Sequence, residues 1–315
     1  MTPKDRGSGE LVQLLKAASF VSRVVFDAPI GVLTTYRVGG CATALIEVHN
    51  PDELVELGRI AASAATPVLV VGGGSNLLVA DSGFDGVALT LGSSFSRSEV
   101  SGTIVTAGAA VKLPVLARAT VAAELTGFEW AVGVPGTVGG AVRMNAGGHG
   151  AEIRDSLKSA DVVDLASGAR VQLGIRDLDF GYRSSSITES QVVVSAEFHL
   201  DRGIPRDGER LMSEIVQWRR ANQPGGQNAG SVFTNPPGLS AGRLIEEAGA
   251  KGLRLGSAQV STKHANFIQA DENGSADDIH NLMREVMSMV LQTHGIELRV
   301  ETKTVGFSDP VGSRG

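Results

Sequence analysis

Three residues carry side chains suited to chemistry: Arg183, Ser231 and Glu301. The guanidinium of Arg183 can hold a carboxylate through two hydrogen bonds, although a surface ion pair is the ordinary role of an arginine. Ser231 follows a glycine, and its hydroxyl can donate a proton if its neighbours lower its pKa, although a turn serine is the simpler interpretation. Glu301, taken alone, is an exposed carboxylate on a predicted strand.

Two glycine-rich stretches indicate close approach of the backbone to a ligand. The first, 72–76, follows the apolar run 68–71, which predicts a strand buried on both faces. Its glycines reach positive φ without a clash, and successive N–H groups there can bind an anion such as a pyrophosphate. The spacing matches neither G-x-G-x-x-G nor a P-loop. Because a second stretch, 133–150, has the same character, we expect one large shared ligand.

Composition limits the class of protein. The 315 residues are 42% hydrophobic and 20% charged, which is typical of a soluble globular protein with two or three domains. The net charge of −6 argues against a nucleic-acid binder. The polar start and the lack of a long apolar run predict a cytoplasmic protein without membrane insertion. Cys41 is the single cysteine, so no intrachain disulfide forms, and we expect it to be a small buried residue. The histidine spacing gives no support for a metal site.

The elements that position these residues alternate between strand and helix. Asn50 and Pro51 predict a helix start, with the asparagine as N-cap and Glu53 at N3. This helix lies between two predicted strands, and the β-α-β unit implies a mixed or parallel sheet. Further helices are predicted at 11–20, 114–125, 209–222, 240–249 and 275–293. Further strands are predicted at 86–91, 102–107, 159–165, 170–173, 192–200 and 296–305.

Three segments are predicted to lack regular structure. Residues 1–8 and 308–315 form loose tails, and 201–207 form a domain boundary rich in charge, glycine and proline. Within the helix 209–222 we expect Leu211, Ile215 and Trp218 to face inward.

Taken together, the sequence motifs resemble the UDP-N-acetylenolpyruvoylglucosamine reductase family. The likeness covers about residues 28–306, and the motifs occur in the family's order. They are T-T-Y-R-V-G-G (34–40), V-G-G-G-S-N-L-L (71–78), G-V-P-G-T-V-G-G-A (133–141), M-N-A-G (144–147), Y-R-S-S (182–185), G-S-V-F-T-N-P (230–236), A-G-R-L-I-E-E-A-G-A-K-G (241–252) and K-H-A-N-F-I (263–268).

The resemblance implies a mixed α/β and α+β architecture with an FAD-binding fold of the vanillyl-alcohol-oxidase type. The expected parts are a tail and short helix (1–20), two FAD-binding subdomains (21–92 and 93–203), a domain for a UDP-sugar (204–307) and a tail (308–315). It also implies that NADPH reduces noncovalently bound FAD, which passes hydride to C3 of the enolpyruvyl group of UDP-N-acetylglucosamine enolpyruvate. The product is UDP-N-acetylmuramate, a peptidoglycan precursor.

The resemblance also assigns residues to roles. Arg183 would stabilise the enolate, Ser231 would protonate C2, and Glu301 would polarise the carboxylate or hold a proton. The implied cofactor contacts are Tyr36, Arg37, Gly39, Gly72, Gly73, Gly74, Ser75, Asn76, Leu77, Gly133, Pro135, Gly136, Thr137, Gly140, Ala141 and Asn145. The implied substrate contacts are Arg183, Arg219, Asn235 and Asn266. The expected partners are the nucleotide sugar and NADPH, with no nucleic acid, and the expected state is a monomer or weak dimer.

Some positions depart from the family pattern. The family usually has an aromatic residue near position 149, whereas here His149 follows M-N-A-G-G, and Arg299 replaces the first acid of L-E-x-E before Glu301. No large insertion lies between 192 and 209, which indicates the shorter subtype without the extra tyrosine loop. Two alternatives remain open: a flavoenzyme of the same fold, such as an oxidase, that acts on another sugar or enol, and a noncatalytic protein that binds nucleotide sugars.

Overall fold

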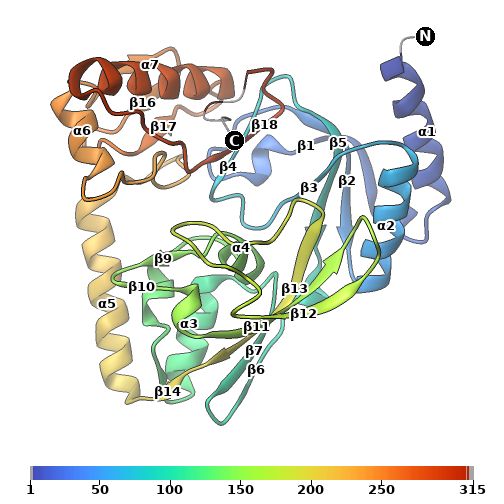
Figure 1. Ribbon diagram of the computed structural model, residues 1–315, viewed down its shortest axis with the longest axis horizontal. Helices are drawn as coiled ribbons and strands as arrows, with labels where there is room; N and C mark the ends of the chain where they lie inside the picture. The colour runs from blue at the N-terminus through green and yellow to red at the C-terminus, as the bar shows by residue number, and fades with distance from the viewer. Residues whose placement is uncertain (1–2, 310, 312–315) are drawn as a thin grey trace. The chain divides into compact units, whose positions relative to one another are not determined.

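The computed structural model describes residues 3–309 and 311. Their backbone divides into two units, each assembled from separate stretches of the sequence, which the colours of Figure 1 allow the reader to follow. Unit 1 comprises the described residues of Met1–Phe26, Thr43–Gly73 and Gly86–Trp218, and unit 2 comprises those of Asp27–Ala42, Gly74–Asp85 and Arg219–Gly315. The predicted domain limits at 20, 92, 203 and 307 follow the sequence alone and stay a prediction.

The elements follow in chain order. The α-helices are α1 (Pro3–Ala17), α2 (Pro51–Ser63), α3 (Leu113–Ala122), α4 (Val138–Arg143), α5 (Pro205–Asn222), α6 (Ala241–Glu247) and α7 (Ala276–His294). The strands are β1 (Val24–Pro29), β2 (Cys41–Val48), β3 (Val68–Val70), β4 (Leu77–Val79), β5 (Phe84–Leu91), β6 (Ser98–Ser101), β7 (Ile104–Gly108), β8 (Leu125–Thr126), β9 (Gly147–Gly148), β10 (Ala151–Glu152), β11 (Leu157–Asp164), β12 (Arg170–Gly174), β13 (Gln191–His199), β14 (Asp201–Arg202), β15 (Arg254–Leu255), β16 (Ala258–Val260), β17 (Ile268–Ala270) and β18 (Lys303–Val305). Short 3₁₀ turns lie at Val21–Arg23, Gly31–Leu33, Ser93–Phe95, Glu129–Gly133 and Ile153–Asp155.

Unit 1 is built around two sheets. One has the order β1-β2-β5-β3, and its β3–β5 pair is parallel, which agrees with the predicted mixed or parallel sheet. The other has the order β12-β11-β13-β7-β6 and is antiparallel. Two clusters of buried apolar side chains form the core of this unit. The prediction that 68–70 is buried on both faces is wrong: β3 is half-buried because it is the last strand in its sheet.

Helix α2 begins where the sequence predicts. Asn50 is its N-cap, and its side-chain oxygen accepts a hydrogen bond from the backbone N–H of Glu53 at 3.0 Å. Pro51 occupies the first turn, where its missing N–H leaves no bond unmade. The helix approaches the chain after β11 closely at Gly58, where a Cβ would lie 2.1 Å from the carbonyl oxygen of Leu165. The α2 contact therefore depends on the absence of a side chain.

Unit 2 is organised around α7, which packs on β16 and β17 (Figure 1). The hydroxyl of Ser275 caps this helix by accepting from the N–H of Asp278, and Gly295 ends it at φ +67°. The apolar face of α7 is buried at Ile279, Leu282, Met283, Val286 and Val290, and Met287 beside it is half-buried. Met283 within this face is a core residue.

The predicted strand 296–305 is wrong over most of its length. Only Lys303–Val305 forms a strand, which pairs in parallel with β4, with Lys303 opposite Leu77. The reason is that β4, which the sequence did not indicate, is itself three residues long.

Two helices begin earlier than predicted. Helix α1 begins at Pro3, so the tail prediction for 1–8 is wrong from that residue on, while residues 1–2 lie outside the described chain. Helix α5 begins at Pro205, inside the predicted boundary 201–207. In both cases the proline suits the first helical turn, a signal that the composition of these segments concealed. The predicted tail 308–315 lies largely outside the described residues.

Two predictions of burial are also wrong. On α5, Met212 and Ile215 are buried whereas Leu211 and Trp218 are exposed, so the inward face is rotated from the predicted one. Cys41 is exposed, because it begins β2 and falls on the solvent side of that strand's alternating burial.

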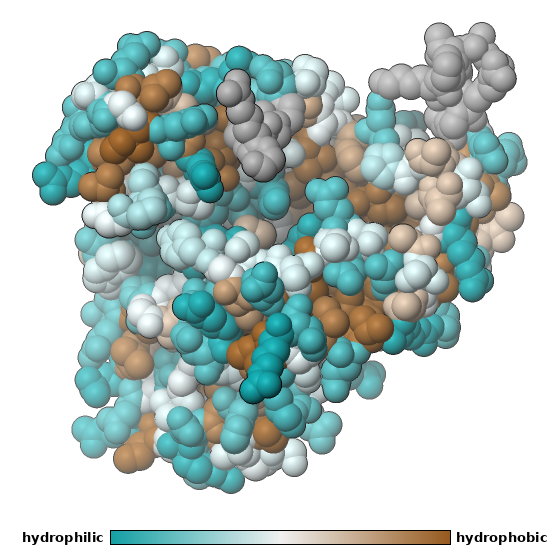
Figure 2. Space-filling view, in the orientation of Figure 1, coloured by the Kyte–Doolittle hydropathy of each residue, from teal (hydrophilic) through white to brown (hydrophobic). Residues whose placement is uncertain are grey.

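The surface carries both hydrophilic and hydrophobic residues. On the face drawn in Figure 2, hydrophilic residues alternate with smaller hydrophobic areas, as is usual for folded proteins. Within the described part of the chain, no helix has the length and apolar character that crossing a membrane requires.

The close approach at Gly58 leads to a prediction about stability. Gly58→Ala should lower the free energy of unfolding by about 1–3 kcal/mol, because the new methyl must displace the carbonyl of Leu165. Gly9→Ala in α1 is the matched control, since no atom lies within 4 Å of a Cβ there, and it should gain about 0.5–1 kcal/mol. Urea denaturation of both variants measures the difference; equal midpoints would contradict the prediction.

Candidate active site

The two glycine-rich stretches meet within unit 1. Gly72 and Gly73 are exposed and follow β3. A Cβ on Gly73 would lie 2.8 Å from the Cα of Gly136, and one on Gly72 would lie 2.7 Å from the hydroxyl of Thr137. The two loops therefore pack backbone against backbone, as expected for parts of one ligand site.

Arg183 is fixed by main-chain carbonyls of the M-N-A-G segment in the same unit. Its guanidinium donates to the carbonyl of Gly147 at 2.8 Å and to that of Asn145 at 3.4 Å. It also lies over the ring of Tyr182, 5.1 Å from the centroid. The backbone of Arg183 has φ +56°, a conformation that few residues other than glycine adopt. These contacts hold the cation in one place.

Asn145 connects the segment that precedes Arg183 to the segment around Arg154. Its side chain is fully buried, and its Nδ2 donates to the carbonyl of Gly181 at 2.9 Å. Its Oδ1 accepts from the N–H of Arg154 at 3.2 Å. Asn145, predicted as a cofactor contact, thus ties together the segments around Arg183.

In unit 2, the T-T-Y-R-V-G-G segment contacts Gly74. A Cβ on Gly74 would lie 2.2 Å from the carbonyl oxygen of Leu33, and the N–H of Thr35 donates to the carbonyl of Gly74 at 3.0 Å. Arg37 is exposed and has φ +56°. Tyr36 is fully buried in the apolar core of the unit, and burial raises the pKa of its phenol. Its phenol therefore stays protonated, and its predicted contact with a cofactor stays a prediction.

The same unit brings Asn76, Ser231 and Glu301 onto neighbouring segments. The side-chain amide of Asn76 donates to the carbonyl of Glu301 at 3.2 Å. The N–H of Glu301 donates in turn to the carbonyl of Val232 at 2.7 Å, directly after Ser231. A bridge between Phe233 and Val300 continues this pairing. Two predicted catalytic residues and one predicted cofactor residue are therefore held in fixed register by main-chain bonds.

The predicted substrate residues of unit 2 differ in their surroundings. Arg219 is half-buried and donates to Gln223 at 2.8 Å, and burial lowers the pKa of its guanidinium. Asn235 is exposed, and its Oδ1 accepts from the N–H of Ala241 at the start of α6. Asn266 is buried and bonds through both polar atoms of its side chain to Phe233.

The remaining predicted cofactor residues divide by exposure. Pro135 and Gly140 are exposed, Gly39 and Ser75 are half-buried, and Leu77, Gly133 and Ala141 are buried. Their roles stay predictions.

One supporting residue was missed by the sequence analysis. The buried hydroxyl of Thr34 donates to the carbonyl of Gly31 at 2.7 Å and accepts from the N–H of Arg37 at 3.1 Å. A threonine three positions before the residue that it holds is the local signal that could have found it.

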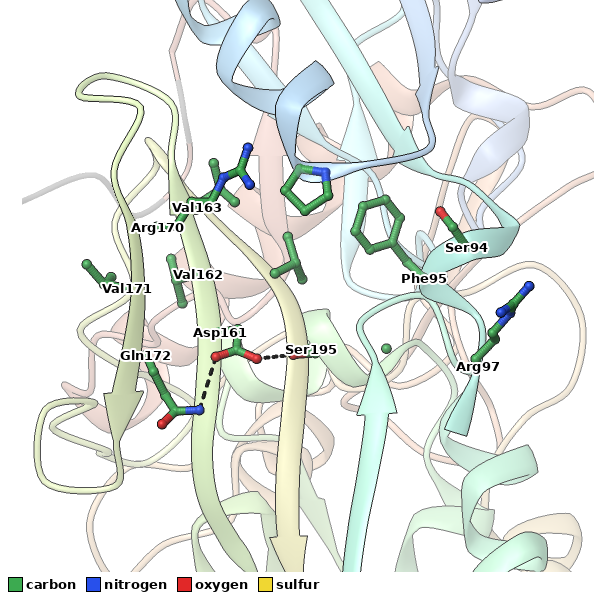
Figure 3. Close-up of a pocket in the computed structure, with 13 residues that line it drawn as sticks. Ser94, Phe95, Arg97, Asp161, Val162, Val163, Arg170, Val171, Gln172 and Ser195 are labelled. Carbon is green, nitrogen blue, oxygen red and sulfur yellow. Dashed lines mark hydrogen bonds between the residues drawn. The ribbon is translucent and has the colours of Figure 1, made fainter. Parts of the chain in front are cut away.

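A pocket of about 520 Å³ lies elsewhere in unit 1 (Figure 3). Asp161, Gln172 and Ser195 are among the residues that line it, and the carboxylate of Asp161 accepts hydrogen bonds from the side chains of the other two. Of the described residues that line it, none is a predicted site residue. Its carboxylate is already paired, so this pocket does not compete with the glycine loops as the candidate site. The part of the chain that the structure describes holds no group of acidic, histidine or cysteine side chains arranged for a metal.

Comparison with known proteins agrees with this geometry. Residues 42–174 match an FAD binding domain, and residues 222–305 match the C-terminal domain of UDP-N-acetylenolpyruvoylglucosamine reductase. The chain is 42% identical over 286 residues to the UDP-N-acetylenolpyruvoylglucosamine reductase of Paramagnetospirillum magneticum, covering 90% of this chain and 92% of the relative. It is 39% identical over 300 residues to that of Rubrobacter xylanophilus, covering 95% and 98%.

Solved structures give the same result. The UDP-N-acetylenolpyruvylglucosamine reductase of Thermus caldophilus superposes with a TM-score of 0.77 at 35% identity, covering 90% of this chain and 98% of that one. A BBE-like protein of Physcomitrella patens, with a TM-score of 0.57 at 14% identity and coverage of 92% and 90%, shares the fold alone.

Fold and site together define a flavoprotein whose FAD-binding domain has the predicted mixed α/β fold. The chain belongs to the UDP-N-acetylenolpyruvoylglucosamine reductase family.

The glycine loops of unit 1 fit an FAD pyrophosphate. Gly72 and Gly73 expose bare backbone, and a side chain at either position would fill the space in which the two loops meet. Backbone N–H groups that a phosphate can reach without an intervening Cβ are the usual means of binding it. The residues present therefore fit the cofactor that the family implies.

This packing leads to a prediction about cofactor binding. Gly73→Ala should weaken FAD binding by at least about 10-fold, because the methyl would force Gly136 away and open the paired loops. Flavin absorbance per mole of purified protein, and titration of the apoprotein with FAD, measure the loss. Gly225→Ala is the control, since a Cβ there meets nothing within 4 Å. Equal FAD content in the two variants would contradict the prediction.

Proposed function

We propose that this protein reduces UDP-N-acetylglucosamine enolpyruvate to UDP-N-acetylmuramate, with FAD as bound cofactor and NADPH as reductant. Membership in the reductase family supports the reaction. The observation that carries it to this chain is the register in unit 2, where main-chain bonds connect the segments of Ser231 and Glu301. A hydroxyl on one of these segments can donate a proton to a carbon next to a carboxylate, and a carboxyl group on the other can return the proton to it.

Arg183 is the residue we assign to charge stabilisation. When bound, FAD supplies the hydride that it has taken from NADPH. Addition of that hydride at C3 of the substrate leaves negative charge spread into the substrate carboxylate. A fixed guanidinium lowers the energy of that charge without having to reorganise, and the contacts of Arg183 with Gly147 and Asn145 keep it fixed.

Ser231 is the residue we assign to proton transfer. Its hydroxyl would donate a proton to C2 of the substrate, which completes the reduction of the double bond. Glu301 would polarise the substrate carboxylate or hold the proton that restores Ser231. A carboxylate beside an anionic substrate must be protonated or paired, since otherwise it repels the charge that it should stabilise.

Arg219 suits the diphosphate of the nucleotide sugar. Its guanidinium is half-buried, and Gln223, the side chain to which it donates, is neutral. An anionic ligand would repay the cost of this burial, which already lowers the pKa of Arg219. Arg220 and the exposed Asn235 are further candidates for the same ligand.

The wider setting follows from the reaction. The product is a precursor of peptidoglycan, so the protein would serve cell-wall synthesis and, through it, cell shape, the cell cycle and cell division. We propose a cytoplasmic monomer or weak dimer that binds FAD noncovalently, with the nucleotide-sugar domain in residues 204–307.

An assay with purified protein tests this function. The protein should be yellow and should oxidise NADPH only after UDP-N-acetylglucosamine enolpyruvate is added, yielding UDP-N-acetylmuramate. A colourless protein that FAD cannot reconstitute would overturn the proposal. Production of H₂O₂ with another sugar and no NADPH turnover would instead identify an oxidase of the same fold.

The role of Ser231 can be tested separately. Ser231→Ala should leave reduction of the flavin by NADPH unchanged, because the hydroxyl takes no part in that step. Reduction of the enolpyruvyl substrate should fall by roughly 10²–10⁴-fold, the usual contribution of a positioned proton donor. Stopped-flow measurement of the two half-reactions distinguishes them, and unchanged turnover would show that Ser231 is not the donor.

A further inference from the structure

The two residues that follow Ser231 have every polar main-chain group bonded. The N–H of Val232 donates to the main-chain carbonyl of Asn266 at 2.9 Å, and the carbonyl of Val232 accepts from Glu301 at 2.7 Å. The N–H of Phe233 donates to Oδ1 of Asn266 at 3.0 Å, and Nδ2 of Asn266 donates back to the carbonyl of Phe233 at 2.8 Å. Three of these four bonds therefore involve Asn266.

These bonds are made away from water. Asn266 is 4% exposed, Val232 0% and Phe233 2%. In such surroundings a hydrogen bond is stronger than at the surface, and an unpaired polar group is costly. The side-chain amide uses its donor and its acceptor on a single residue, so it fixes the orientation of both peptide planes of Phe233.

Asn266 is itself held by the turn that precedes it. Its N–H donates to Nδ1 of His264 at 3.2 Å. Burial lowers the pKa of His264, so its ring stays neutral at neutral pH and Nδ1 keeps the lone pair that accepts this bond. The buried hydroxyl of Ser261 accepts from the N–H of Lys263 at 3.1 Å, which closes the turn.

On its other side, Ser231 follows a left-handed turn. Gly230 has φ +77°, and its N–H donates to the side chain of Asn228 at 3.1 Å. Ser231 thus lies between a turn that glycine permits and a pair of residues that Asn266 fixes. The side chain of Asn266 has no polar atom left outside this arrangement.

We propose that Asn266 is a positioning residue for Ser231: its amide clamps Phe233, and through the chain it sets where the Ser231 hydroxyl lies. This replaces the predicted role of Asn266 as a direct substrate ligand. The inference rests on the proposed function of Ser231 as proton donor.

Asn266→Asp tests the clamp with almost no change of shape. The new carboxylate can accept from the N–H of Phe233 but repels its carbonyl, where Asn266 donates. We expect substrate-dependent turnover to fall by about 100-fold, the cost of a displacement on the order of 1 Å at a reacting group. NADPH-dependent flavin reduction should remain unchanged.

The pH dependence of this variant supplies a second measurement. Burial beside a carbonyl raises the pKa of the introduced carboxyl. As the pH falls through that pKa, the neutral acid regains a donor for the carbonyl of Phe233, so turnover relative to wild type should rise. Asn266→Ser, which cannot span the clamp, should lose turnover without this recovery at low pH.

Hydrogen exchange provides a measurement that does not depend on activity. In both Asn266 variants, the amides of Val232 and Phe233 should exchange faster than in wild type at the same pH. Ser275→Ala is the matched control in unit 2, because it removes the cap of α7 and lowers stability without touching this clamp. It should leave turnover unchanged, and it should speed exchange of these two amides only by as much as it speeds exchange of the other buried amides of unit 2, whereas the Asn266 variants should affect Val232 and Phe233 more than the rest.

The outcomes separate this inference from the proposed function. If Ser231→Ala is inactive while both Asn266 variants keep wild-type turnover and exchange, the clamp is wrong and the proposed function stands. If Asn266→Asp raises KM and leaves kcat unchanged, Asn266 binds substrate directly and the positioning role is overturned. If Ser231→Ala retains full turnover, Ser231 is not the proton donor, and the positioning role of Asn266, which rests on it, is overturned as well.

Discussion

Contact of backbone with backbone, with no side chain between, is the constraint on which the candidate site depends. At Gly73 and Gly136 it lets two loops of unit 1 share one surface. At Gly74 it lets the chain lie directly on Leu33, so that the segment carrying Arg37 is positioned in unit 2. A methyl group at Gly73 or Gly74 would lie 2.8 Å or 2.2 Å from an atom of another backbone segment, closer than non-bonded atoms approach, so at these positions glycine is a geometric requirement.

The sequence predicted those features of the fold that depend on a few neighbouring residues. The start of α2 at Asn50 and Pro51 and the start of α7 at Ser275 were found because a helix cap depends on a few consecutive residues. The strand pair β4–β18 was missed because its strands are short and its pairing joins distant segments. Cys41 and Trp218 were placed on the wrong side, since burial depends on which neighbouring element covers a face, and no local pattern records that.

The candidate site likewise has parts that the sequence indicated and parts that it did not. The glycine loops could be located from composition and spacing, and a family resemblance supplied Arg183, Ser231 and Glu301. Neither the composition nor the family resemblance indicated the structural roles of two asparagines. Asn145 and Asn266 both appeared as ligand contacts, yet each is buried with both ends of its amide bonded to the chain. An amide is suited to this because it offers a donor and an acceptor without a charge that burial would penalise. Each asparagine supports the segment of one proposed catalytic residue.

The alternation of the chain between the two units has a consequence for biosynthesis. Asn76 meets the carbonyl of Glu301 across 225 positions of sequence, and β4 meets β18 in the same place. A ribosome has therefore released the glycine loop long before it makes the residues that complete its surroundings in unit 2. A nascent or prematurely terminated chain that ends before Glu301 lacks the segment that fixes Asn76. The surroundings of Asn76 can therefore form only after the ribosome has translated β18. A chain that stops earlier cannot complete this part of the site.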